Sequence, residues 1–189
     1  MRAPLANIRG FCDTLDYREL DDNERVEVLA GISASAKRLD DVITDLNFIL
    51  QMKQGVSENK EPVFFANLVE DIKFSIANLV NNEKVVIITD FNEVDKKITI
   101  RSYLYSIFYN LIINSIKYRR PDVAPVIEIT SRKQENKLVL LFKDNGLGID
   151  LEKRGNYVFG LYKRFHPQIE GKGMGLFMTK TQVEMLGGK

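Results

Sequence analysis

Residues 104–118, LYSIFYNLIINSIKY, are apolar at nearly every position, which predicts a helix that is buried on more than one side. Asn110, Asn114 and Lys117 interrupt this pattern with the spacing i, i+4, i+7. At about 100° per residue they form one narrow polar stripe. Amide oxygens can ligate a hard cation, and a lysine ammonium suits phosphate. On this helix alone, a metal–phosphate site and an ordinary solvated helix edge are equally favoured.

Two helices are expected at residues 2–17 and 23–54, with Asp21 or Asp22 as the cap of the second. A hairpin of two helices has too little core of its own, so its apolar seam requires a partner. We therefore expect a homodimer through residues 2–54 that forms a four-helix bundle. The heptad seam on the second helix consists of Leu29, Ile32, Ala36, Leu39, Ile43, Leu46 and Leu50.

The polar stretch 55–62 contains Gly and Pro and is interpreted as a domain boundary, between residues 1–55 and 60–189. Helices interleaved with mostly antiparallel strands indicate an α+β chain, with a two-layer α/β sandwich after the hairpin. The elements expected in the second domain are a helix at 64–80, the helix at 104–118, strands at 84–91, 97–100, 126–133 and 137–143, and a tight turn at Glu135-Asn136 that joins the last two strands.

Two glycine clusters follow the polar stripe. DNGLGI at 144–149 comes directly after the apolar run LVLLF, so it places a carboxylate at a strand end beside a tight turn. GKGMG at 171–175 opens a helical pattern, where backbone N–H groups can approach an anion. Either cluster alone is weak, because Gly-X-Gly is common in turns. The ordered set is much more specific and favours the metal–phosphate interpretation.

In this order the motifs resemble those of the catalytic core of bacterial two-component sensor histidine kinases. NLIINSIKY resembles the N box, DNGLGID the first glycine box, FGLYKRFH the phenylalanine box, and GKGMGLFMTKTQVEMLGGK the second glycine box. RAPLANIRGF resembles the segment just after the phosphoacceptor histidine. The resemblance covers essentially the whole chain. It implies a sandwich of the histidine kinase, gyrase and chaperone ATPase type.

The resemblance also implies roles for individual residues. Asn114 would ligate magnesium, and Asn110 would line the same site. Lys117 would contact phosphate and Tyr118 would lie by the nucleotide. Asp144 would accept a hydrogen bond from the adenine amino group.

The remaining implied site residues are glycines. Gly146 and Gly148 would form the turn beside the aspartate, and Gly171, Gly173 and Gly175 would form the lid hinge and the phosphate-binding helix start. The implied cofactors are ATP and magnesium. The implied activity is transfer of the γ-phosphate to a histidine and then to an aspartate of a response regulator receiver domain.

Residues 150–172 have weak periodicity and are interpreted as a mobile lid over the nucleotide. Lys163 and Arg164 are a solvated pair in the simplest interpretation, but in this loop we expect at least one phosphate contact and assign it to Arg164. His166 is the only histidine in the sequence. It precedes Pro167 in the lid, so a structural or incidental role is expected for it.

Two features depart from the family pattern. The family's acceptor histidine lies three residues before the position of Arg2, which falls before Met1. The sequence ends at GGK189, where the family usually continues with one or two more strands. Both gaps resemble the boundaries of a fragment. We therefore expect no catalytic histidine in these residues and no autophosphorylation by the fragment alone.

Composition narrows the alternatives. A formal net charge of +1 does not suggest that the chain binds nucleic acid. No apolar run has the length of a membrane span. Cys12 is the single cysteine and fits a reducing compartment, so a cytoplasmic location is expected, with a membrane tether outside these residues left open. The competing hypotheses are a catalytically silent dimeric scaffold and a gyrase- or chaperone-type ATPase. The glycine boxes disfavour the first, and the hairpin disfavours the second.

Overall fold

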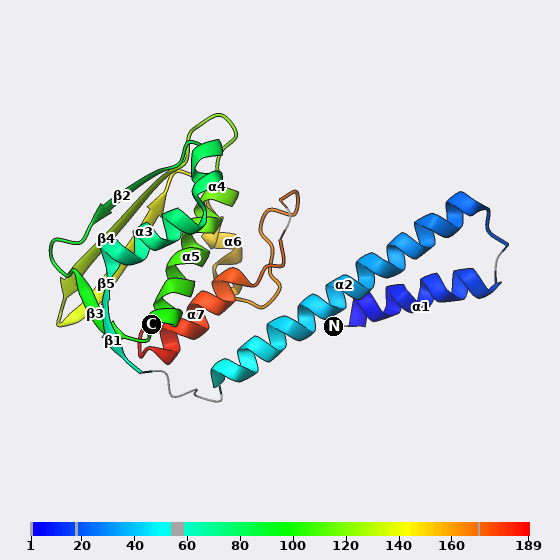
Figure 1. Ribbon diagram of the computed structural model, residues 1–189, viewed down its shortest axis with the longest axis horizontal. Coiled ribbons are helices and arrows are strands. Elements are labelled where there is room, and N and C mark those ends of the chain that lie inside the picture. The colour runs from blue at the N-terminus through cyan, green and yellow to red at the C-terminus, as the bar shows by residue number, and fades with distance from the viewer. Residues whose placement is uncertain (1, 18, 54–58, 170) are drawn as a thin grey trace. The chain divides into compact units, whose positions relative to one another are not determined.

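The computed structural model describes residues 2–17, 19–53, 59–169 and 171–189. The chain divides into two compact units, one up to residue 57 and one from residue 58. The first unit is a hairpin of α1 (Arg2–Tyr17) and α2 (Asp22–Lys53), which pack along each other (Figure 1). Residue 54, the expected end of the second helix, lies outside the described residues, as do residues 55–58 of the expected boundary. No helix in the described parts of the chain is long and apolar enough to cross a membrane.

The start of α2 is fixed by a reciprocal pair of hydrogen bonds. The backbone N–H of Glu24 donates to Oδ1 of Asp21 at 2.8 Å, and the backbone N–H of Asp21 donates to Oε2 of Glu24 at 3.0 Å. This is a capping box, which satisfies two N–H groups that the first turn leaves without partners. Of the two candidate caps, Asp21 is therefore the one used.

The two hairpin helices approach each other through small residues on α2, while much of the heptad seam stays exposed. A Cβ on Gly31 would lie 2.6 Å from the Phe11 ring, so the ring rests directly on the glycine. Ser35, one turn further along, is buried as well. By contrast, Leu29 is 56% exposed and Ile43 is 50% exposed. The side chains of Leu46 and Leu50 lie outside those that the structure describes.

The second unit is an α/β sandwich. Its helices are α3 (Phe65–Ser75), α4 (Ala77–Asn82), α5 (Arg101–Lys117), α6 (Leu151–Arg154) and α7 (Gly175–Met185), with a 3-10 turn at Gly155–Tyr157. Its strands are β1 (Glu61–Phe64), β2 (Val86–Asp90), β3 (Lys96–Thr99), β4 (Val126–Gln134) and β5 (Lys137–Asp144). The expected fold class, α+β with a helical hairpin before an α/β sandwich, is confirmed.

Several expected boundaries were wrong. The helix expected at 64–80 is two helices, because the chain leaves helical geometry at Ile76, with φ −116° and ψ 23°. The polar stretch 55–62 ends in β1, a four-residue strand that is stabilised by its pairing with β3, a partner far along the chain. Residues 150–172 contain α6 and the 3-10 turn and are therefore not a loop throughout. The remaining elements lie within a few residues of their expected positions.

The strands form two small sheets. β1 pairs antiparallel with β3, and a three-stranded sheet has the order β2-β4-β5. Within it β2 runs parallel to β4, whereas β4 and β5 form the expected antiparallel hairpin. Glu135 and Asn136 both have positive φ, at 47° and 62°, as a two-residue hairpin turn with the twist of the strands requires.

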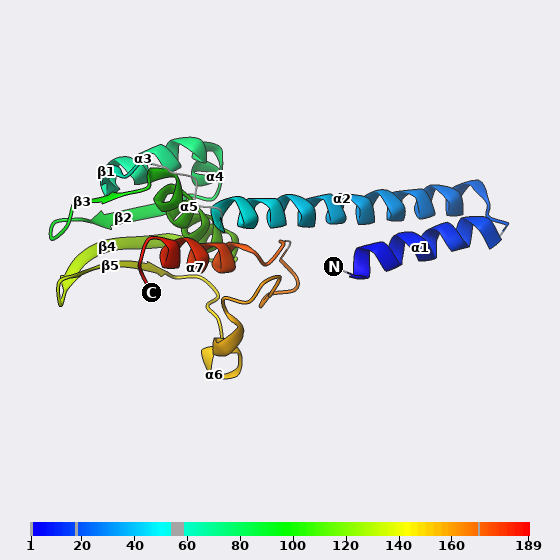
Figure 2. The same cartoon turned by 90° about the horizontal axis from the view of Figure 1, so that it is seen from below.

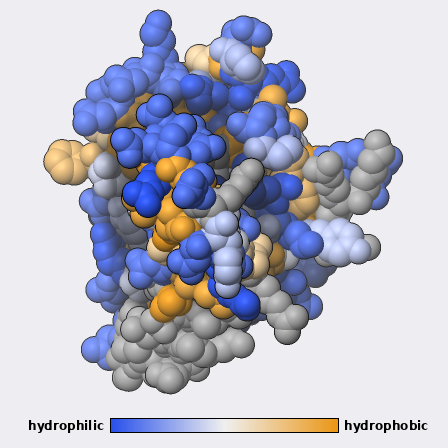
Figure 3. Space-filling model, turned by 90° about the vertical axis from the view of Figure 1, so that its right-hand side faces the viewer, coloured by the Kyte–Doolittle hydropathy of each residue, from blue (hydrophilic) through white to orange (hydrophobic). Residues whose placement is uncertain are grey.

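Helices α3, α5 and α7 cover one face of the three-stranded sheet (Figures 1 and 2). The core between them joins Phe65 and Ile72 of α3, Phe108 and Ile112 of α5, and Ile127 of β4, among others. Phe108 lies at its centre, with its ring 4.9 Å edge-on from Phe142 and 6.2 Å from Phe65. Apolar side chains outside the core are scattered among hydrophilic ones on the surface that Figure 3 shows.

Phe108→Ala should lower the free energy of unfolding of the second unit by about 3–5 kcal/mol, because it removes a fully buried ring from the core. Chemical denaturation followed by circular dichroism measures the change. Phe74→Ala is the matched control, since that ring is 86% exposed, and it should change stability by no more than about 0.5 kcal/mol. Similar losses for both variants would contradict the assignment of the core.

Candidate functional site

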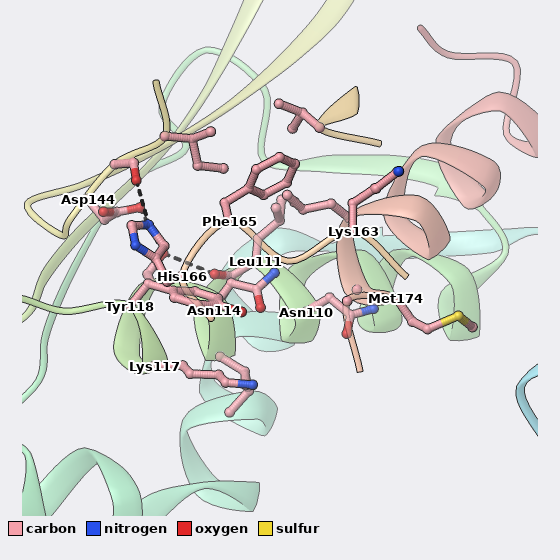
Figure 4. A pocket seen from close by; sticks show the side chains of 18 of the residues that line it. Asn110, Leu111, Asn114, Lys117, Tyr118, Asp144, Lys163, Phe165, His166 and Met174 are labelled. Atoms are coloured by element: carbon pink, nitrogen blue, oxygen red, sulfur yellow. Dashed lines mark hydrogen bonds between the residues drawn. The ribbon is translucent and has the colours of Figure 1, made fainter. Parts of the chain in front are cut away.

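A cavity of about 420 Å³ lies beside the polar stripe of α5, a volume within the usual range of small-molecule sites. Its walls come from α5, the end of β5, the first glycine box, the lid and the start of α7 (Figure 4). Most of the predicted site residues line it. They are Asn110, Asn114, Lys117, Tyr118, Asp144, Gly148, Gly173 and Gly175.

Asp144 ends β5, and two donors hold its carboxylate. The backbone N–H of Gly146 donates to Oδ1 at 2.8 Å, and the Ser115 hydroxyl lies 3.2 Å from Oδ2. Gly146 does not itself line the cavity, but the turn requires it: a Cβ there would lie 2.7 Å from both Oδ1 of Asp144 and the carbonyl oxygen of Tyr118. Each carboxylate oxygen can accept a further hydrogen bond, so Asp144 is positioned and still able to bind a donor on a ligand.

Ser115 was not anticipated as a site residue. It lies one position after Asn114, with only 9% of its side chain exposed, and its hydroxyl is also 3.0 Å from the carbonyl oxygen of Leu111. The sequence signal was a small polar residue directly beside the stripe on a helix that is otherwise apolar.

The start of α7 packs directly on the asparagines of α5. A Cβ on Gly175 would lie 3.3 Å from Nδ2 of Asn114 and 3.7 Å from Oδ1 of Asn110. The missing side chain therefore lets the backbone of α7 come close to both amides. The result is a pair of amide groups facing the N-terminus of a helix, where backbone N–H groups favour negative charge.

Two glycines of the second glycine box lie directly against lysines. Gly171 does not line the cavity, but a Cβ there would clash with the Lys117 ammonium. Gly173 has φ +71°, and a Cβ there would lie 2.6 Å from the carbonyl oxygen of Lys163, so both its conformation and its neighbour demand glycine. Lys172 lines the cavity between these glycines.

The neighbouring lid residues Lys163 and Arg164 lie differently. Lys163 is among the lining residues, whereas Arg164 is not. Nη2 of Arg164 donates to the carbonyl oxygens of Pro167 at 2.6 Å and Ile169 at 2.9 Å, which lie in its own loop. The Lys163 ammonium lies over the Tyr157 ring, 5.5 Å from its centroid.

His166 lies in the cavity wall, although we expected a structural or incidental role. Its Nε2 is 2.9 Å from the carbonyl oxygen of Gly148, and its ring centroid is 5.4 Å from that of Tyr118. Phe165 and Met174 are further lining residues that the sequence did not single out. These residues lie in or beside an irregular loop, where no periodicity shows which way a side chain points.

Charge is distributed unevenly along this cavity. The carboxylate of Asp144 lies at one end with Tyr118 and His166, whereas Lys163 and the glycines that open α7 lie toward the other (Figure 4). A ligand with a hydrogen-bond donor on a flat ring and an anionic tail matches this polarity. A nucleotide has both features.

Comparison with known proteins supports this assignment. Residues 99–189 match the family model described as histidine kinase-, DNA gyrase B-, and HSP90-like ATPase. The chain is 28% identical over 192 residues to the methanogenesis regulatory histidine kinase FilI of Methanothrix harundinacea, covering 100% of this chain and 21% of that protein. It is 28% identical over 197 residues to the sensor protein SrrB of Staphylococcus aureus, covering 100% of this chain and 33% of that one. The chain thus spans a third or less of these relatives.

Solved structures share the fold. The histidine kinase AdeS of Acinetobacter baumannii superposes with a TM-score of 0.60 at 20% identity, covering 97% of this chain and 85% of that one. The histidine kinase ThkA, in complex with the response regulator protein TrrA, gives a TM-score of 0.61 at 19% identity, covering 99% of this chain and 52% of that one. Residues 99–189 therefore match the histidine kinase-, DNA gyrase B- and HSP90-like ATPases, and the chain as a whole resembles the ATP-binding core of sensor histidine kinases.

Proposed function

We propose that this chain binds ATP and magnesium and serves the transfer of the γ-phosphate to a histidine and then to an aspartate of a response regulator. The observation that carries the proposal is the cavity in which Asp144, Asn114, Lys117 and the second glycine box converge. Because the chain spans a third or less of the relatives named above, the activity of the intact protein is part of the proposal.

The aspartate end suits adenine. The adenine amino group is a donor, and a fixed carboxylate is a strong acceptor for it. Guanine carries a carbonyl oxygen at the corresponding ring position, and its lone pairs would face those of Asp144. The backbone N–H of Gly146 donates to the carboxylate and holds it in position, so little reorganisation is needed when an amino group binds to it.

The opposite end suits a polyphosphate with a divalent cation. Lys163 adds positive charge, and the N-terminus of α7 supplies backbone N–H groups. The Lys117 ammonium lies beside both Gly171 and the Tyr118 ring, 5.5 Å from the ring centroid. Among the described residues, no group of three or more His, Cys, Asp and Glu side chains could hold a metal. Magnesium, however, commonly retains waters and is bound largely through substrate phosphates. The amide oxygen of Asn114, beside the Gly175 backbone, fits such a partial protein ligand set, and Asn110 would support it.

The mechanism we propose is one of positioning and charge stabilisation. Magnesium, when bound with ATP, supplies positive charge beside the phosphate oxygens. Asp144 fixes the base, the glycines at 173 and 175 admit the phosphates to the helix N-terminus, and the two lysines stabilise the charge that spreads during transfer. His166, the only histidine of this sequence, lies in the lid at the Asp144 end of the cavity.

The proposed partners are a second copy of this chain and a receiver domain. The exposed apolar residues of the α2 seam support the first, because pairing two hairpins would remove them from water. The ThkA structure contains a response regulator and supports the second by analogy. We place this chain in the cytoplasm, where ATP is available, with any membrane anchor in other residues. We propose no contact of this chain with nucleic acid or membrane.

Asp144→Asn should weaken ADP binding by about 1–3 kcal/mol, because one acceptor oxygen becomes a donor that faces the adenine amino group. Isothermal titration calorimetry measures the change. Asp122→Asn is the control, since Asp122 is exposed and lies outside the cavity lining. Equal affinities of the Asp144 variant and the parent chain would refute the adenine assignment.

Asn114→Ala should uncouple ADP binding from magnesium. The adenine contacts remain, so binding persists, but its dependence on magnesium concentration shrinks. Titrations of ADP with magnesium and with EDTA give this dependence for the variant, the parent chain and the exposed control Asn81→Ala. A magnesium dependence equal to that of the parent would mean that another group holds the metal.

Leu29→Asp combined with Ile43→Asp should convert a dimer into monomers, because two charges would be buried in the seam. Light scattering reports the mass. Ala30→Asp combined with Ala34→Asp is the matched control, since both alanines are exposed on the other side of α2. A parent chain that stays monomeric at high micromolar concentration would be evidence against the bundle.

A further inference from the structure

His166 forms part of the cavity wall at the same end as Asp144. Its imidazole lies against Tyr118, with a centroid distance of 5.4 Å and an angle of 40° between the ring planes (Figure 4). Tyr118 comes from the end of α5, whereas His166 comes from the lid, so the contact joins a fixed element to the loop that covers the cavity. Both rings line the cavity itself.

The loop that carries His166 is organised by its own hydrogen bonds. The backbone N–H of Ile169 donates to the carbonyl oxygen of His166 at 3.1 Å, which closes a tight turn. The Arg164 guanidinium donates to the carbonyl oxygens of Pro167 and Ile169 at 2.6 and 2.9 Å. Arg164 is thus a positioning residue: it stabilises the turn that presents the imidazole.

The hydrogen bond to Gly148 fixes the tautomer of the imidazole. A carbonyl oxygen can only accept, so Nε2 of His166, which lies 2.9 Å from it, carries the hydrogen. In the neutral ring Nδ1 is then an acceptor. The lid therefore presents a flat ring of fixed orientation and tautomer, anchored to the first glycine box.

We propose that His166 is a base-contacting residue, and that its imidazole and the Tyr118 ring together form an aromatic wall for the purine of a bound nucleoside di- or triphosphate. The inference rests on the proposed function and adds a residue from the lid to the recognition of the base. Flat rings stack on nucleobases through their faces, which excludes water from the base and fixes its plane. A bound base would thereby favour the closed position of the lid, as the phosphates would.

The single histidine makes the imidazole a direct spectroscopic probe. In proton NMR, ADP should shift the imidazole Hε1 and Hδ2 resonances, and nuclear Overhauser effects should join them to H2 or H8 of adenine. Inorganic tripolyphosphate, which has no base, should give no such Overhauser effect and a much smaller shift. At a pH where the ring is neutral, its nitrogen-15 spectrum should place the hydrogen on Nε2.

Affinity separates a contact with the base from other roles of the histidine. His166→Ala should weaken ADP binding by about tenfold, the size of effect that loss of one aromatic–base stack gives. His166→Phe keeps a flat ring and should stay within about threefold of the parent. Gln168→Ala, an exposed residue of the same turn outside the cavity lining, should bind like the parent.

The outcomes are distinguishable. If the unmodified chain fails to bind ADP in calorimetry, the proposed function fails and this inference with it. If ADP binds but the imidazole resonances show no contact with adenine, this inference alone is overturned. Tighter binding by His166→Ala would also overturn it, because the imidazole would then occupy the place of the base. Base contacts in the spectrum together with the expected order of affinities would support it.

Discussion

The site depends on the close approach between the start of α7 and the polar stripe of α5. α5 is anchored by its buried faces, where Phe108 and Ile112 are fully buried, so the opposite stripe cannot shift without disturbing the core. The absence of a side chain at Gly175 lets α7 reach Asn114 and Asn110 directly. The same helix thus stabilises the fold and carries the two half-buried amides of the site.

This arrangement makes the two ends of the cavity chemically different. Asp144 lies at the end of β5, in a turn that Gly146 makes possible, whereas the glycines of the second box lie at the N-terminus of α7. A carboxylate therefore faces one part of a ligand and backbone N–H groups and lysines face another. The lid contributes to both ends, with His166 near Asp144 and Lys163 near the second glycine box. A nucleotide can satisfy both ends in one orientation alone.

The sequence predicted best where regular structure sets the direction of side chains. The helical period brought Asn110, Asn114 and Lys117 to one wall of the cavity, and the end of an apolar strand brought Asp144 into the same cavity. It predicted poorly where long-range contacts decide: β1 exists because β3 pairs with it. In the lid, the neighbours Lys163 and Arg164 lie differently: Lys163 lines the cavity, whereas carbonyl oxygens of the folded loop hold the Arg164 guanidinium. No local pattern revealed that difference.

A crystal structure of the chain with magnesium and a non-hydrolysable ATP analogue would show how the cavity binds a nucleotide. We expect the adenine amino group within hydrogen-bonding distance of Asp144, the phosphates along Gly173 and Gly175, and the metal next to Asn114. A nucleotide bound outside this cavity, or bound inside it with its phosphates toward Asp144, would contradict the account.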